Sequence, residues 1–225
     1  MALRRLVLLT GPLEAEFIRS RVVPSTYPIA AADSLEALEA ALPADDSDTL
    51  LLGFCTGVIV PERLLDRVPR LAFNIHPGPP SFPGRHPESW GAYHGVDRFG
   101  ATLHRMAPRV DEGEIVDVEW MAMAPGSGQL EFGRQALRAA VRLVGRWLVP
   151  LLEGKVPAPT AYRWSGHKTS HAEAEAMRHM TPAIAAEEFE RRRLAFAEVP
   201  GSELTLELYG QSFVRRTPDG GVPPG

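Results

Sequence analysis

Short apolar runs and segments of helical periodicity alternate through the first hundred residues of the chain. The apolar runs that predict strands are 5–10, 27–31, 49–54 and 71–75. The helical patterns between them are 13–22, 34–42 and 61–68. Asp33 is the cap candidate for the second of these helices. A run as continuous as 49–54 is typical of a strand buried on both faces of a parallel sheet, so the pattern predicts an α/β fold.

Beyond residue 76 the pattern becomes irregular before two more strands and a long helix. Residues 77–87, PGPPSFPGRHP, are rich in proline and predict a rigid, irregular loop. A short helix is predicted at 87–94, and two strands are predicted at 101–106 and 114–123. The helix predicted at 127–152 has one apolar stripe, formed by Leu130, Leu137, Val141, Val144, Leu148 and Leu151.

The last third of the chain predicts a small appendage of helices and a β-hairpin. A capping box at Ser170 opens one helix, and Thr181 precedes the proline at the start of a second. A hairpin is predicted from the alternation with polar residues of Leu204, Leu206 and Leu208. Residues 217–225 are expected to be disordered. We therefore divide the chain into a main domain at 1–155 and a C-terminal extension at 156–225.

Composition and charge exclude several classes of partner. The net charge is −4 and the isoelectric point is near 6.0, so no positive field indicates nucleic acid or an anionic membrane. The single cysteine, Cys55, excludes an internal disulfide and is typical of a reducing, cytoplasmic location. The apolar run after Arg5 is too short for a signal peptide, and no run is long enough to span a membrane.

The residues with the clearest chemistry follow the fourth predicted strand. Asn74 and His76 are separated by one residue, so both side chains leave the same face of that strand. Ligands bind at the carboxyl ends of strands in open α/β sheets. An amide there can donate to a developing oxyanion, and an imidazole can stabilise charge or pass a proton. A pair of this kind by itself is more often a loop anchor than a functional site, and Asp111 by itself is typical of an ordinary turn.

Three stretches together resemble a known family. They are residues 55–61 (CTGVIVP), 73–78 (FNIHPG) and 99–116 (FGATLHRMAPRVDEGEIV). In this order they resemble the catalytic domain of the folate-dependent formyltransferases, which include the glycinamide ribonucleotide, methionyl-tRNA and nucleotide-sugar N-formyltransferases. The similarity covers roughly residues 5–155. The resemblance implies a Rossmann-like, mostly parallel twisted sheet with flanking helices, and a formyltransferase catalytic domain at 1–155.

The resemblance also implies roles for individual residues. Asn74 would hydrogen-bond the formyl oxygen, His76 would stabilise the oxyanion, and Asp111 would hold His76 or a water and accept the amine proton. The formyl donor would be N10-formyltetrahydrofolate. It would bind against two turns, at Gly57, Val58, Ile59, Val60, Pro108 and Val110. Arg85 and His86 flank the proline-rich loop and are the candidates for contacting the acceptor, since Arg suits phosphate or carboxylate groups.

Departures from the family pattern narrow the acceptor. The first strand is followed by Thr10-Gly11-Pro12 and not by a phosphate-binding loop, which argues against a glycinamide ribonucleotide. The extension is too short for the basic β-barrel of the tRNA enzymes. What remains resembles the sugar-amine members, so a small-molecule amine, a nucleotide-linked amino sugar, is the expected acceptor. Short extensions of that group often use a hairpin in dimer formation, which implies a homodimer here.

Two other functions remain open from the sequence. The same three side chains would suffice for a formyltetrahydrofolate hydrolase, with water as the acceptor. The fold would also suit a non-catalytic module that binds a one-carbon adduct or serves in maturation. No metal is expected, because His171, Glu175 and His179 at helical spacing are more typical of a solvated helix face.

Overall fold

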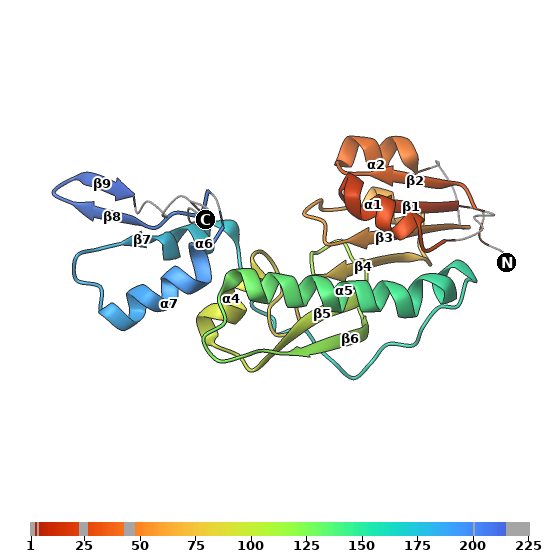
Figure 1. Ribbon diagram of the computed structural model, residues 1–225. Helices are drawn as coiled ribbons and strands as arrows, with labels where there is room; N and C mark the ends of the chain where they lie inside the picture. Colours follow the sequence, from red (N-terminus) through yellow and green to blue (C-terminus); the bar gives the residue numbers. More distant parts are fainter. Residues whose placement is uncertain (1–2, 4, 23–26, 43–47, 200, 215–225) are drawn as a thin grey trace, which may run out of the picture.

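The computed structural model describes residues 3, 5–22, 27–42, 48–199 and 201–214, arranged around a large sheet with a smaller sheet at one end (Figure 1). The large sheet has six strands in the order β2-β1-β3-β4-β5-β6. In chain order the strands are β1 (Arg5–Leu9), β2 (Ile29–Ala32), β3 (Thr49–Phe54), β4 (Ala72–His76), β5 (Arg98–Arg105) and β6 (Ile115–Ala122). The first four run parallel, and β5 and β6 are antiparallel to their neighbours. The predicted α/β fold is confirmed.

Helices cover the two faces of this sheet because its central strands are apolar on both faces. On β1, Leu6 and Leu8 face the core that contains α1 (Pro12–Arg19) and the long α5 (Gln129–Leu152). Val7 and Leu9 face the opposite core, which contains α2 (Leu35–Ala41) and α3 (Glu62–Leu65). In Figure 1, α5 runs across the sheet as its longest helix. No helix among the described residues is long and apolar enough to cross a membrane.

Two local predictions are wrong, each for a physical reason. The cap of α2 is Ser34 and not Asp33, because the Ser34 hydroxyl accepts the backbone N–H of Ala37. On α5, Leu130 and Leu137 are 50% and 47% exposed. The positions buried in their place are Phe132, Ala136, Ala139, Ala140 and Leu143, three of which are alanines. Alanines let the helix lie close to the sheet, so the buried face in this part of the helix is rotated relative to the leucine stripe.

The C-terminal extension packs against the rest of the chain through α4 (Pro87–His94) and α7 (Ala186–Phe196). Phe196 is fully buried, with its ring centroid 5.1 Å from Trp90 and 5.9 Å from Tyr93. The predicted capping box at Ser170 is confirmed and opens α6 (His171–Arg178). The second helix begins at Ala186, later than Thr181. The division at residue 155 into two units stays a prediction.

The predicted hairpin is confirmed as β8 (Thr205–Leu208) and β9 (Gln211–Val214). Its two-residue turn is Tyr209-Gly210, with φ of +53° and +74°, the left-handed values that a tight hairpin turn requires. A short parallel strand, β7 (His179–Met180), adds a third member that the sequence pattern did not predict. Leu204 is buried against Met180 and Ala197. The expected disordered tail, 217–225, lies outside the described residues.

The contact between α4 and α7 generates a test of how the extension is held. Phe196→Ala should lower the free energy of unfolding by about 3–5 kcal/mol, because it removes a fully buried ring and leaves a cavity. Leu13 on α1 is 83% exposed, so the control Leu13→Ala should cost less than about 1 kcal/mol. Urea unfolding followed by tryptophan fluorescence measures both. A Phe196→Ala protein with an unchanged urea midpoint would show that α7 does not contribute to the stability of the main sheet.

Candidate active site

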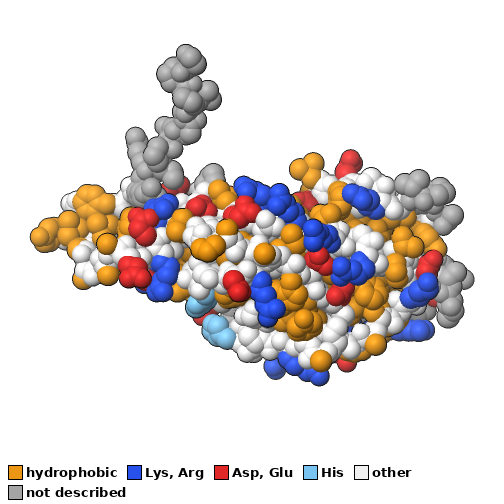
Figure 2. All heavy atoms as spheres, turned by 60° about the horizontal axis from the view of Figure 1, so that its bottom comes forward, with side chains coloured by type: hydrophobic (Ala, Val, Ile, Leu, Met, Phe, Trp, Pro, Cys, Tyr) orange, Lys and Arg blue, Asp and Glu red, His pale blue; other side chains and the backbone are white. Residues whose placement is uncertain are grey.

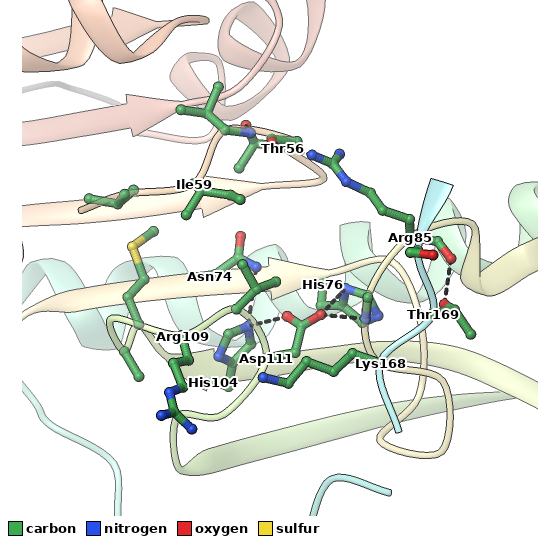
Figure 3. A pocket seen from close by; sticks show the side chains of 18 of the residues that line it. Thr56, Ile59, Asn74, His76, Arg85, His104, Arg109, Asp111, Lys168 and Thr169 are labelled. Atoms are coloured by element: carbon green, nitrogen blue, oxygen red, sulfur yellow. Dashed lines mark hydrogen bonds and ion pairs between the residues drawn. The ribbon is translucent and has the colours of Figure 1, made fainter. Parts of the chain in front are cut away.

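A cavity of about 410 Å³ lies at the carboxyl ends of β3 and β4 (Figure 3). Phe73 and Ile75 of β4 point into the core beneath α5. Asn74 and His76 point to the opposite face, and both line the cavity. The cavity is bounded by the turn after β3, the turn after β5, the proline-rich loop and the segment before α6. We call residues 160–170, which carry part of this last wall, the strap.

Asn74 and His104 are direct partners across the antiparallel pair β4 and β5. The Asn74 amide Nδ2 lies 3.1 Å from Nε2 of His104, and Nδ1 of His104 lies 2.7 Å from the carbonyl oxygen of Arg105. The carbonyl can only accept, so Nδ1 carries the hydrogen and Nε2 accepts from Asn74. An amide nitrogen has two hydrogens, so the second N–H of Asn74 remains free to donate.

The His104 ring is held in its neutral form. Burial lowers the pKa of His104 to about 4, and this effect exceeds the opposing attraction of Asp111. A neutral ring keeps the Nε2 lone pair that Asn74 needs. A bulge in the pairing of β5 with β6 falls between Leu103 and His104, and bulges re-aim side chains in this way.

Asp111 joins the two imidazoles. Its side chain is 2% exposed, Oδ2 lies 3.5 Å from Nδ1 of His76, and Oδ1 lies 3.5 Å from Nε2 of His104. The backbone N–H of Gly84 donates to Oδ2 at 2.8 Å. The backbone of Asp111 has a φ of +49°, an uncommon conformation that aspartate tolerates better than most residues. The carboxylate is therefore fixed by the proline-rich loop and both strands.

The hydrogen bond of His76 determines which of its nitrogens faces the carboxylate. Nε2 lies 3.0 Å from the carbonyl oxygen of Phe82, so Nε2 carries a hydrogen and donates it. Nδ1 is then the atom that faces Asp111, and it can take up a second proton. That atom lies 3.5 Å from Oδ2 of Asp111. His76 and Asp111 together can accept one proton from a group in the cavity.

One wall of the cavity is largely backbone and aliphatic side chains. Gly57, Val58, Ile59 and Val60 line it from the turn after β3. Val110 and Met106 line it from the turn after β5. Ile59 is 56% exposed and Val110 is 40% exposed at the mouth. Pro108 is not among the described residues that line the cavity.

A charged wall of the cavity is formed by the proline-rich loop and the strap. Arg85 lies at the edge of the cavity and donates from Nη2 to the carbonyl oxygen of Gly57 at 2.9 Å. Lys168 of the strap forms an ion pair with Glu112. His86 is not among the described lining residues, but its Nε2 lies 3.0 Å from Nδ1 of His171, which does line the cavity. Figure 3 shows Arg85 reaching across toward the turn at Thr56.

The structure thus brings Asn74, His76 and Asp111 into one cavity, and their chemical roles stay a prediction. It adds a residue that the sequence analysis did not select, His104. Its position in the run that precedes Asp111 is a usable signal, because an antiparallel strand beside β4 places it opposite Asn74. The strap was missed as well, since nothing in its sequence indicates where it lies.

No group of three or more His, Cys, Asp or Glu among the described residues is arranged to hold a metal ion. All three residues that share helical spacing in the extension have other partners, and that of His179 is the Thr205 hydroxyl. His171 contacts His86, and Glu175 contacts Arg178 of the same helix. His179 lies beyond the end of α6, in β7.

Solved structures share this fold at low sequence identity. A sugar N-formyltransferase from a Shewanella species has a TM-score of 0.76 at 15% identity, covering 96% of this chain and 97% of that one. An N-formyltransferase from Helicobacter canadensis, in complex with folinic acid and dTDP-3-aminofucose, has a TM-score of 0.70 at 13% identity, covering 92% and 85%. HypX from Aquifex aeolicus, in complex with tetrahydrofolic acid, has a TM-score of 0.60 at 17% identity, covering 94% and 37%.

The sequence match is to the formyl transferase family, over residues 14–140. That stretch includes β4, β5, and the turn of Asp111. Since it exceeds half of the 225 residues, this chain belongs to the formyl transferase family and is a formyltransferase.

Proposed function

We propose that this enzyme transfers a formyl group from N10-formyltetrahydrofolate to a primary amine of a small metabolite, a nucleotide-linked amino sugar. The observation that carries the proposal is the shared cavity of Asn74, His76 and Asp111. One donor N–H is free on Asn74, and a buried carboxylate lies beside an imidazole nitrogen that can take a proton. Acyl transfer needs these two functions, a donor for the oxyanion and an acceptor for the amine proton.

The donor fits the backbone-rich wall. Flat heteroaromatic rings are commonly held between apolar side chains and backbone groups, and this wall offers Ile59, Val110 and the backbone of 56–60. The Asn74 Oδ1 atom is buried without a partner among the described residues, so a bound N–H group would satisfy it. The relatives from Helicobacter and Aquifex, solved with folate derivatives, support this choice of donor.

The proposed reaction balances with the side chains present. The bond between the formyl carbon and N10 of the donor breaks, and a bond forms between that carbon and the amine nitrogen. Asn74 donates to the formyl oxygen while negative charge develops on it. The amine gives up one proton, which His76 Nδ1 and Asp111 accept, and N10 gains one. The neutral His104 ring keeps the Asn74 amide oriented throughout.

The acceptor is proposed from the charged wall and from the relatives. Arg85 uses one N–H of its guanidinium on Gly57, which leaves further donors in a planar fork suited to a phosphate. His86 would act on the acceptor site indirectly, because its Nε2 atom contacts Nδ1 of His171, a residue that lines the cavity. The Helicobacter enzyme was solved with dTDP-3-aminofucose, which supports a nucleotide-linked amino sugar as the class of acceptor.

We also propose that the enzyme forms a homodimer through its hairpin, and that it acts in the cytoplasm. All four residues of β9 are exposed. Tyr209 is 95% exposed, Phe213 49% and Val214 58%. Figure 2 shows apolar side chains gathered at this end of the molecule. Because an exposed edge strand with apolar side chains readily pairs with another strand, a second copy of the hairpin is the proposed partner.

The site assignment predicts the effect of removing each group. Asn74→Ala should lower kcat about 10²–10³-fold, the usual cost of losing one oxyanion donor, while the donor still binds. Asp111→Asn should be at least as damaging, because the amide cannot accept the proton. Combining Asp111→Asn with His76→Ala should be no worse than the poorer single change, since the two act as a unit. Formylated amine and free formate are quantified together, so that hydrolysis is seen.

The matched control for the carboxylate is Asp97→Asn, at an exposed position outside the cavity. It should leave kcat within about twofold. Near-normal turnover in Asp111→Asn would sink the assignment of the proton acceptor. Formate without formylated amine would favour a hydrolase.

The neutral state of His104 predicts how stability varies with pH. Its pKa is about 4 when folded and 6.5 when free, so the unfolded chain binds more protons between these values. Stability from this group is therefore present above pH 6.5 and is lost as the pH falls toward 4. Between pH 7 and pH 5 the loss should be about 2 kcal/mol. Urea unfolding at both pH values measures this loss of the free energy of unfolding. His104→Gln should abolish it, whereas the control His94→Gln, at an exposed position, should retain it. Equal pH dependence in wild type and His104→Gln would contradict a neutral His104.

The dimer proposal is tested with one added charge. Phe213→Asp should convert a dimer to a folded monomer at micromolar concentration, because an unpaired carboxylate cannot be buried in an apolar interface. Ser212→Asp adds the same charge on the opposite face of β9 and should leave the dimer intact. Sedimentation velocity measures both. A wild-type protein that sediments as a monomer at this concentration would show that the hairpin does not associate.

A further inference from the structure

One aromatic residue outside the matched stretch touches both site imidazoles. Trp164 lies in the strap, beyond residues 14–140. Its ring lies 5.0 Å from the ring of His104 at an interplanar angle of 88°, and 5.7 Å from the ring of His76 at 79°. Both are edge-to-face arrangements, the geometry that aromatic pairs prefer. One indole therefore contacts both imidazoles that flank Asp111.

The indole is also fastened to the turn that presents the carboxylate. Its Nε1–H donates to the carbonyl oxygen of Gly113 at 2.9 Å, two residues after Asp111. A Cβ atom on Gly113 would lie 1.8 Å from the carbonyl oxygen of Arg105, so only glycine permits this close approach of the turn to β5. Trp164 thus contacts both rings and the turn of the carboxylate at once.

The strap holds Trp164 in place through backbone hydrogen bonds at both ends. The N–H of Thr160 donates to Ile115 at 2.8 Å, and the N–H of Ser165 donates to Pro80 at 2.9 Å. Farther along, Thr169 donates to Pro83 at 3.1 Å and accepts from Arg85 at 2.8 Å. The segment is therefore fixed to β6 and to the proline-rich loop, so the indole cannot withdraw without breaking several of these bonds.

Trp164 does not face the cavity, since it is not among the described residues that line it. It is half-buried and lies behind the imidazoles. We infer that Trp164 is a positioning residue, which fixes the ring planes of His76 and His104 and excludes water behind them. The expected effect of Trp164 on turnover rests on the proposed function. Its expected effect on the order of the histidine rings rests on the geometry alone.

The effect on rate follows from the tolerance of the reaction to displaced groups. Misplacing a catalytic group by about 1 Å can cost on the order of 100-fold in rate. Trp164→Leu should therefore lower kcat about 10- to 100-fold, with KM for donor and acceptor changed less than about threefold. Trp164→Phe keeps an aromatic ring at this position but loses the five-membered ring of the indole together with its N–H. It should recover most of the lost rate.

A second readout does not depend on turnover. Nitrogen-15 NMR of the histidine rings, assigned with His76→Gln and His104→Gln, reports which ring nitrogen carries the hydrogen. In the wild type His104 should show one form, with the hydrogen on Nδ1. In Trp164→Leu its signals should move toward the average of the two forms, and the pH of half-protonation should rise because water reaches the ring.

The matched control is Trp147→Leu. Trp147 is also half-buried with a bonded indole, donating to Asp117 at 2.7 Å, but it packs beneath the sheet and away from the cavity. It should lower stability without changing kcat or the histidine spectra. If Trp164→Leu does not fold, Trp164→Met serves instead, since it keeps an unbranched apolar side chain without a ring.

The inference is overturned if the folded Trp164 variant has wild-type histidine spectra, or if Trp147→Leu changes them equally. If no amine is formylated by the wild type, the proposed function fails, and the spectra still decide the role of Trp164. A third outcome is that Trp164→Leu changes the histidine spectra but leaves kcat at the wild-type value. The indole would then order the two rings without serving catalysis, and the inferred effect of Trp164 on turnover would be overturned.

Discussion

The Asp111 carboxylate is almost wholly enclosed, and three separate segments surround it. The proline-rich loop donates the N–H of Gly84 to Oδ2, β4 places Nδ1 of His76 3.5 Å from the carboxylate, and β5 places Nε2 of His104 3.5 Å from it. Leaving a buried carboxylate unpaired would cost several kcal/mol, so the loop that carries Gly84 has to assemble with the turn that carries Asp111. Gly84 shows how tight this assembly is. It has a φ of +96°, and a Cβ there would lie 2.3 Å from the carbonyl oxygen of Thr169, so the strap crosses the loop at the residue that holds the carboxylate.

Burial and the attraction of Asp111 have opposite effects on the pKa of His104, and their balance gives this ring a different role from His76. At His104 burial wins over the attraction of Asp111, and the pKa falls to about 4. A ring that stays neutral is a poor proton acceptor at neutral pH, but it is a constant hydrogen-bond acceptor for Asn74. His76 has its Nε2–H committed to Phe82, which leaves Nδ1 as the atom beside the carboxylate. In the proposed reaction, His76 and Asp111 would therefore accept the proton that the amine releases.

Elements that depend on local pattern could be predicted from the sequence. β3 occupies the predicted 49–54 because a continuous apolar run leaves little choice between its two faces. α4 occupies the predicted 87–94, since a proline begins it and Gly95 ends it in a left-handed conformation. The pair Asn74 and His76 could be placed at a strand end for the same local reason. Asp111 could be assigned to the same site only from the order of the three family-like stretches along the chain, because no single residue indicated it.

Features that depend on contacts between segments far apart in the sequence could not be predicted in this way. The buried face of α5 is chosen by alanines that let the helix lie close to the sheet, and a pattern that counts large apolar residues selects Leu130 and Leu137 instead. His104 becomes significant only when β5 is known to run antiparallel beside β4. β7 is two residues long and exists only because β8 pairs with it. No periodicity marks the path of the strap, which is fixed by backbone bonds to distant carbonyls.

The parts of the site that could be predicted from the sequence and those that could not have different proposed functions. The residues that would carry the formyl chemistry all lie within the family's stretch, 14–140, on paired strands and the turns after them. Part of the charged wall, which is proposed to meet the acceptor, comes from the strap outside that stretch, at Lys168, Thr169 and Ser170. Side chains of the strap can change while its backbone hydrogen bonds to the proline-rich loop persist, because those bonds do not involve the side chains. Such substitutions would alter the charged wall without disturbing the pair of Asn74 and His104, since that pair is held by β4 and β5.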